Sequence, residues 1–159
     1  MNFNNIDELK LAGFIGFKTI KELELNNSII PIENGVYLVL NINKKKVEFQ
    51  EIGSGGFFKG IDPNVSISIL EENWVDNTIV LYIGKANSLK KRLLQYIQFG
   101  NGRNVGHYGG RYIWQIRNCK TLVVCWKILK NDNPKSIESD LIKEYKRIYI
   151  KRPFANLQG

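Results

Sequence analysis

The 159-residue chain has no acidic residue between Asn77 and Asn131, although ten Lys and Arg residues lie in that 55-residue stretch. Residues 1–75 hold 7 basic and 10 acidic side chains, whereas residues 76–159 hold 16 basic and 5 acidic ones. Such a depletion of one charge sign predicts a polyanionic partner, and nucleic acid is the usual one. Because glycines and strand-like runs interrupt the bases, the pattern does not fit a basic amphipathic helix lying on a membrane.

Long apolar runs are also missing from the chain. No stretch approaches the roughly 20 apolar residues that span a bilayer. The first eleven residues carry acids before any base and lack the apolar core of a secretory signal. We therefore expect a cytoplasmic protein that does not contact a membrane.

Cysteine and histidine are scarce, with two Cys, one His and no CxxC pair, which argues against a zinc site. Cys119 and Cys125 lie in an apolar stretch that is typical of a strand. Six residues of strand span roughly 20 Å, which is too far for a disulfide. We expect both thiols to be reduced and to pack on one face of that strand.

The remaining pattern is that of a single globular domain with 43% hydrophobic residues. Apolar, β-branched runs predict strands over residues 36–40, 47–52, 79–83, 111–116 and 121–129. Helical spacing predicts one or two short helices within 6–25, a helix over 89–99 capped by Ser88, and a long helix that begins at Asn133 and Pro134. Together these elements predict an α/β or α+β fold, with a small, largely antiparallel central sheet flanked by helices.

Several side chains match the needs of phosphodiester cleavage. The attacking water must lose a proton, a cation must neutralise the phosphate, and the leaving oxygen must be stabilised. Tyr37 and Tyr82 are candidates for proton transfer, and Lys85 and Arg92 are candidate cationic donors. Glu138 is the candidate carboxylate for a hard metal ion. Each has a structural alternative, since tyrosine is common in buried strands and a helix arginine can simply face solvent.

Two short motifs make the chain resemble the GIY-YIG nuclease superfamily. The first is Gly35-Val36-Tyr37, with Val in place of the middle Ile. The second is Tyr82-Ile83-Gly84, and the run that follows it to Leu93 is very similar to the nuclease domain of the bacterial excision repair incision subunit. The resemblance covers about residues 34–40 and 79–159. It implies a metal-dependent endonuclease that uses one Mg²⁺ or Mn²⁺ ion on nucleic acid, with DNA favoured over RNA.

The same resemblance implies a role for each of these residues. Glu138 would hold the metal ion, and Arg92 would stabilise the scissile phosphate. Tyr37, helped by Tyr82 or Lys85, would deprotonate the attacking water, and the sequence leaves open which of the two tyrosines is the base.

Further residues are candidates for catalysis or for nucleic-acid binding. Tyr96, one helical turn after Arg92, and Asn156, just after a proline, match two more family positions, although Asn156 could equally cap a C-terminal turn. His107, the only His, could contact phosphate or serve as an additional base or proton shuttle. The bases expected to bind nucleic acid are Lys90, Lys91, Arg103 and Arg111.

The chain departs from the compact family core in two places. Residues 41–78 form an insertion between the two motifs, and residues 1–33 are expected to be a helical extension of the nuclease-like domain over 34–159. Two alternative functions stay open. One is a non-catalytic nucleic-acid-binding module on the same fold, and the other is a sequence-specific, restriction-type endonuclease that cuts both strands as a homodimer.

Overall fold

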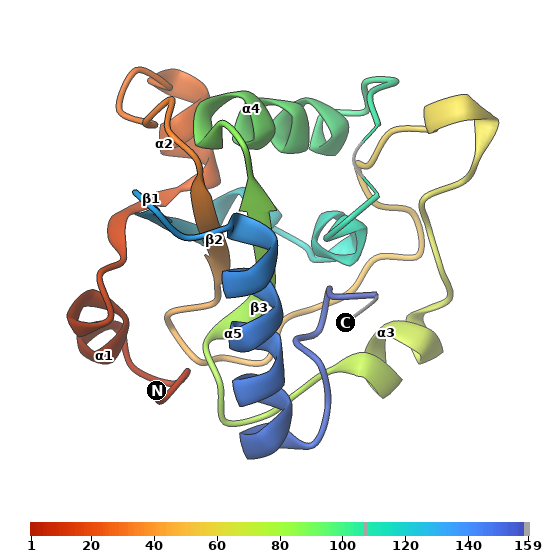
Figure 1. The fold of residues 1–159 in the computed structure, drawn as a ribbon. Coiled ribbons are helices and arrows are strands. Elements are labelled where there is room, and N and C mark those ends of the chain that lie inside the picture. The colour runs from red at the N-terminus through yellow and green to blue at the C-terminus, as the bar shows by residue number, and fades with distance from the viewer. Residues whose placement is uncertain (107, 158–159) are drawn as a thin grey trace.

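A computed structural model of the chain describes residues 1–106 and 108–157 (Figure 1). Its strands are β1 (Ile15–Thr19), β2 (Gly35–Leu40), β3 (Val80–Ala86) and β4 (Val123–Ile128). Its α-helices are α1 (Ile6–Leu11), α2 (Ile20–Leu25), α3 (Ile67–Asn73), α4 (Leu89–Gly100) and α5 (Pro134–Tyr149). Three short 3₁₀ turns are η1 (Phe58–Gly60), η2 (Arg111–Gln115) and η3 (Cys119–Thr121). Within these residues, no helix has the length and apolarity needed to cross a membrane.

The four strands form one antiparallel sheet in the order β1-β4-β2-β3. The expectation of an α+β fold with an antiparallel sheet is therefore confirmed. Every residue of β2 is buried, because β3 and β4 flank it and both faces of the sheet are covered. Strand β3 lies at one edge, so the backbone groups on its outer side need partners from outside the sheet.

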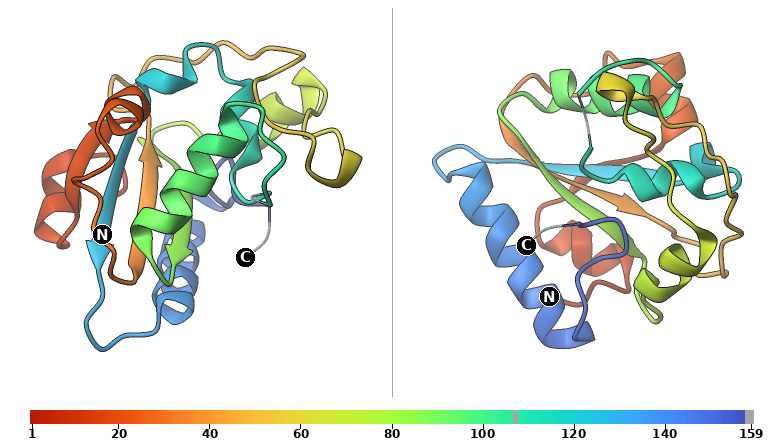
Figure 2. Two further views of the ribbon diagram at one scale, coloured as in Figure 1. Left: turned by 90° about the horizontal axis from the view of Figure 1, so that it is seen from above. Right: turned by 90° about the vertical axis from the view of Figure 1, so that its right-hand side faces the viewer.

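Two clusters of buried side chains cover the two faces of the sheet, with α1 and α5 on one side and α2 and α4 on the other (Figure 2). Alternation along β2 sends Val36, Leu38 and Leu40 to the side of α1 and α5, which we call the aliphatic face. Tyr37 and Val39 point to the opposite side, which we call the aromatic face. Consecutive residues of β2 therefore point into two different buried clusters.

Helices α4 and α5 begin where the sequence predicts. The Ser88 hydroxyl accepts from the Lys91 N–H at 3.3 Å, and the Asn133 side chain accepts from the Lys135 N–H at 2.8 Å. Pro134 occupies the start of α5, where its missing N–H costs nothing. The predicted apolar side of α4 is buried through Leu89, Leu93, Tyr96 and Ile97.

Three expectations about strands are wrong. Residues 47–52, all within the described part of the chain, form no strand, and Phe49 makes only an isolated bridge to Ile116. Residues 111–115 form η2 rather than a strand, because a short buried apolar run suits either element. Residues 1–33 contain the two expected helices but also β1, which pairs with β4 although Gly16 and Phe17 have φ values of 97° and 54°.

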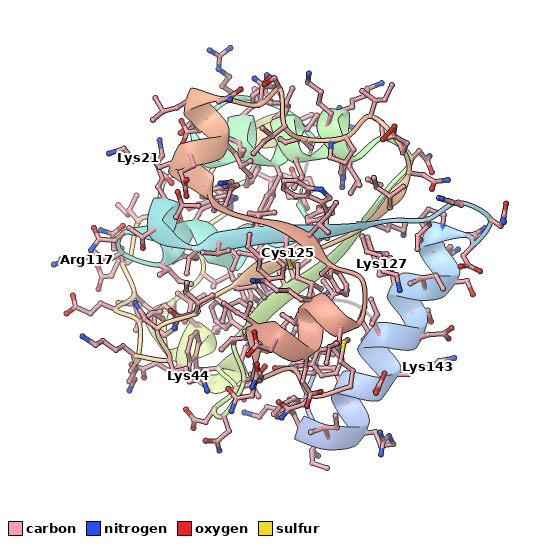
Figure 3. The ribbon with its side chains drawn as sticks, turned by 90° about the vertical axis from the view of Figure 1, so that its left-hand side faces the viewer. Lys21, Lys44, Arg117, Cys125, Lys127 and Lys143 are labelled. Atoms are coloured by element: carbon pink, nitrogen blue, oxygen red, sulfur yellow. The ribbon has the colours of Figure 1, made fainter. Side chains whose placement is uncertain are left out.

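Both cysteines are free and buried, as expected, but they do not share one face of a strand. Cys119 lies in η3 and packs with the aromatic face, whereas Cys125 lies in β4 and packs with the aliphatic face. Figure 3 shows Cys125 in the interior, while the Lys21, Arg117 and Lys143 side chains extend outward. The expected strand was extended too far, since β4 begins only at Val123.

Candidate active site

A cavity of about 730 Å³ lies where the edge strand β3 ends, between α4 and the first turns of α5. The loop before η2 and the C-terminal segment complete its wall. Segments that are distant in the sequence thus meet at one place. Six of the predicted site residues line the cavity: Tyr82, Lys85, Arg92, Arg111, Glu138 and Asn156.

Glu138 and Lys85 form an ion pair inside this cavity. The Lys85 Nζ lies 3.2 Å from the Glu138 Oε2, and the two side chains are 48% and 18% exposed, respectively. Glu138 lies in the second turn of α5. Because Lys85 is half-exposed, the pair contributes little to stability, so a ligand that enters the cavity can compete for either group.

Two tyrosines from neighbouring strands form the wall behind this ion pair. Tyr37 is completely buried, Tyr82 is 6% exposed, and their ring centroids are 5.9 Å apart. Burial raises the pKa of Tyr37 well above its usual value and raises the pKa of Tyr82 to about 12. The hydrogen bond between them raises the pKa of Tyr37 and lowers that of Tyr82. Tyr82 is therefore the member of the pair that faces the cavity.

Two glycines make room for these rings. Gly84, the last residue of the second motif, is the cross-strand neighbour of Tyr37, and a Cβ there would lie 2.7 Å from the Tyr37 hydroxyl oxygen. Gly110 has a φ of 76°, and a Cβ there would lie 3.1 Å from the Tyr82 ring. Any larger residue at either position would push the tyrosines apart.

Arg92 approaches the tyrosines from the first turn of α4. Its side chain is partly buried, and its positive charge lowers the pKa values of both Tyr37 and Tyr82. Its Nη1 lies 3.4 Å from the Gln95 Oε1, a long hydrogen bond that holds the guanidinium only weakly. The guanidinium can therefore turn toward a ligand without losing a strong contact. Three other predicted bases, Lys90, Lys91 and Arg103, lie outside the cavity lining.

Asn156 holds the outer edge of β3. Its side-chain amide accepts from the Ile83 N–H and donates to the Ile83 carbonyl, both at 2.9 Å. The Ala155 N–H also donates to the Leu81 carbonyl at 2.8 Å, so the C-terminal segment pairs with the edge strand. The Asn156 side chain thus positions β3, which carries three cavity residues, Tyr82, Lys85 and Ala86.

Tyr96 supports the wall from behind. It is completely buried, and its hydroxyl donates to the Gly110 carbonyl at 3.0 Å. Its ring stacks on that of Tyr82 with the centroids 5.9 Å apart. Tyr96 therefore connects α4 to the glycine-rich loop and lies outside the cavity lining.

Asn87, Tyr108 and Lys135 are among the residues of the cavity wall that the sequence did not reveal as site residues. Lys135 lies three residues before Glu138, and residues three apart share a face of a helix, so helical spacing could have found it. Tyr108 offers no comparable signal, because periodicity does not determine the path of a glycine-rich loop. The predicted role of His107 concerns a position outside the described residues.

The residues of this cavity fit a metal ion that is held by a single carboxylate. Within residues 1–106 and 108–157, no three Asp, Glu, His or Cys side chains gather into a metal site. Mg²⁺ is often bound by one or two carboxylates, with substrate phosphates and water as its other ligands. Glu138, partly exposed in a cavity lined by bases, matches that kind of site.

Comparison with known proteins found no matching family model, no matching curated protein and no matching solved structure. The sequence motifs and the geometry of this cavity are therefore the features of the chain that bear on its function.

Proposed function

We propose that this protein is a metal-dependent endonuclease of the GIY-YIG type that hydrolyses phosphodiester bonds in nucleic acid, with DNA favoured over RNA. The observation that carries the proposal is the meeting of Glu138, Arg92, Lys85 and Tyr82 in one cavity. Phosphodiester hydrolysis needs a carboxylate for the metal ion, cations for the phosphate and a hydroxyl for the water at the same place.

The cations of the cavity bind the scissile phosphate in this proposal. Among the described residues that line the cavity, Glu138 is the single acidic side chain. Four basic side chains also line the cavity: Lys85, Arg92, Arg111 and Lys135. The planar guanidinium of Arg92 matches the geometry of two phosphate oxygens. A phosphate in the cavity would therefore be attracted by the surrounding charge and oriented by Arg92.

Glu138 is the proposed ligand of one Mg²⁺ or Mn²⁺ ion. When bound, such an ion supplies positive charge that polarises the phosphate. This positive charge also opposes the negative charge of Glu138, and it is the Glu138 charge that raises the pKa of Tyr82. Lys85 would exchange its carboxylate partner for a phosphate oxygen. The 48% exposure of its side chain permits that movement.

Tyr82 is the tyrosine that meets the attacking water in this proposal, because it lines the cavity, whereas the sequence had left open which of the two tyrosines is the base. Tyr37 is completely enclosed, so it can act only through its hydrogen bond to Tyr82. That bond and the charge of Arg92 both favour the ionised form of Tyr82. The ionised hydroxyl takes the proton of the water as the new P–O bond forms and the P–O bond to the leaving oxygen breaks, and a cation of the cavity neutralises the charge on that oxygen.

A non-catalytic nucleic-acid-binding module is the second candidate. Two observations favour it, namely the ion pair that neutralises Glu138 and the Tyr82 pKa of about 12, which keeps that hydroxyl protonated at neutral pH. Both properties suit a binding surface as well as a resting enzyme.

A cleavage assay separates the candidates. The protein is incubated with supercoiled plasmid, single-stranded DNA and RNA, each in Mg²⁺ or in EDTA. We expect Mg²⁺-dependent cutting of DNA that EDTA abolishes. Binding without cleavage in every reaction would instead support the binding module. Linear plasmid cut at defined sites, together with a dimer in light scattering, would support a restriction-type enzyme.

A further inference from the structure

The insertion between the two motifs carries a turn, Phe57–Ile61, that contacts the wall of the cavity. The Tyr108 hydroxyl donates to the Phe58 carbonyl at 2.6 Å, and the two rings meet edge to face at 5.7 Å between centroids. The Lys59 N–H donates to the Asn104 side chain at 3.3 Å. Since Tyr108 lines the cavity, the turn is attached to the cavity rim.

The outer side of this turn is apolar and exposed. Phe57 is 53% exposed and Ile61 is 55% exposed, and the exposed Lys59 lies between them in the chain. Figure 1 shows the turn projecting from the body of the molecule, beside the loop that follows α4. Large apolar side chains that are exposed together beside a cavity mark a surface that a ligand covers.

The backbone of the turn is held in an unfavourable conformation. Lys59 has a φ of 55°, in the left-handed region that side chains other than glycine rarely adopt, and Gly60 follows at 74°. Such a conformation costs free energy and persists when neighbouring contacts hold it, which is common at ligand-binding sites. Phe58, packed against Tyr108, is the inner anchor, and Phe57 is left on the outside.

We infer that the Phe57 ring stacks on an unpaired base of the strand whose phosphate enters the cavity, and that Lys59 binds a neighbouring phosphate. The inference rests on the proposed function, because it assumes that nucleic acid occupies the cavity. Aromatic side chains beside bases are the usual means of holding single strands, since every base offers a face for stacking. The turn would therefore make the protein prefer DNA with unpaired bases next to the cleavage site.

Equilibrium binding to a labelled single-stranded oligonucleotide tests this inference, with Ca²⁺ in place of Mg²⁺ so that no cleavage occurs. Phe57→Ala should weaken binding about tenfold, and Phe57→Trp should restore it. Phe57→Leu keeps an apolar side chain but lacks a ring face, so it should stay weak. Ile52→Ala is the control, because Ile52 is 78% exposed in the same insertion and should leave the affinity unchanged. Lys59→Gln should reduce the slope of log affinity against log salt concentration by about one, which corresponds to one released counterion.

The outcomes separate this inference from the proposed function. Equal affinities of wild type and Phe57→Ala, or full recovery in Phe57→Leu, would overturn the stacking contact. If Phe57→Ala loses affinity and Phe57→Trp recovers it, but the wild-type protein cuts no nucleic acid in Mg²⁺, the stacking contact is supported and the proposed nuclease activity is refuted. If the protein cleaves DNA in Mg²⁺ but the Phe57 variants bind as tightly as the wild type, the nuclease activity is supported and the stacking contact is refuted.

Discussion

The two faces of the sheet are built by the same strands but have different chemistry. Apart from Cys125, the buried strand residues on the aliphatic face, such as Leu38, have hydrocarbon side chains that serve packing. The aromatic face buries the hydroxyls of Tyr37, Tyr82 and Tyr96, which cost free energy unless they are hydrogen-bonded. Because Tyr82 lines the cavity, one face mainly stabilises the fold and the other would carry the proposed reaction. The difference predicts which substitutions impair catalysis and which impair folding.

The largest effect is expected from Glu138→Gln. Helix α5 packs on the aliphatic face through its later turns, whereas Glu138 reaches the cavity from its second turn. Gln keeps the shape but lacks the charge that a hard cation needs, so Mg²⁺-dependent cleavage should fall by about a thousandfold or more with little change in thermal stability. Single-turnover cleavage and a melting curve measure both, and the exposed Asp140→Asn serves as the control. Near-normal cutting by Glu138→Gln would remove Glu138 as the metal ligand.

Arg92→Ala should lower the cleavage rate by about a hundredfold to a thousandfold. It should weaken binding much less, because Arg92 is one of 16 bases in residues 76–159. Single-turnover rates and binding in Ca²⁺ separate the two effects. Lys90→Ala and Lys91→Ala, on the same helix but outside the cavity lining, should weaken binding modestly and leave turnover intact. If all three variants behave alike, Arg92 is an ordinary phosphate contact.

Neighbouring residues of β2 offer a direct comparison of the two faces. Leu38→Ala, on the aliphatic face, should lower the free energy of unfolding by roughly 3 to 5 kcal/mol, because Leu38 is fully buried. Its activity per folded molecule should be unchanged. Tyr37→Phe keeps the ring on the aromatic face, so it should cost less stability but slow cleavage. Urea unfolding measures the stability of each variant, and cleavage per folded molecule measures its activity. Slow cleavage by Leu38→Ala together with normal cleavage by Tyr37→Phe would refute the division between the faces.

The smallest expected effect concerns alkaline pH. Burial raises the pKa of Tyr82 from 10.0 to about 12 in the folded protein, so the unfolded state releases this proton first. The contribution of Tyr82 to stability is complete below pH 10 and is lost as the pH rises to about 12, by about 2 to 3 kcal/mol. Tyr82→Phe should lose less stability over that range in urea unfolding at stepped pH. Parallel curves for the two proteins would show that Tyr82 is not shielded from water.

Much of the fold could be predicted because it depends on short-range patterns. Strands β2, β3 and β4 follow apolar β-branched runs, and helices α4 and α5 follow apolar periodicity with capping residues. Strand β1 could not be predicted, since Gly16 and Phe17 with positive φ interrupt it and its pairing with β4 joins distant parts of the chain. Segment 111–116 was mistaken for a strand because its apolar run also suits a buried 3₁₀ helix.

The sequence by itself determined the order of the motifs, the helix starts and the residue types available for phosphate chemistry, because these depend on near neighbours. Only the tertiary structure decided that Lys85 pairs with Glu138 and that Tyr82 rather than Tyr37 faces the cavity. It also decided that Asn156 binds the backbone of β3. The physical reason is that exposure and pairing across the cavity depend on how β3, α4, α5 and the C-terminal segment pack, and no local pattern encodes that packing.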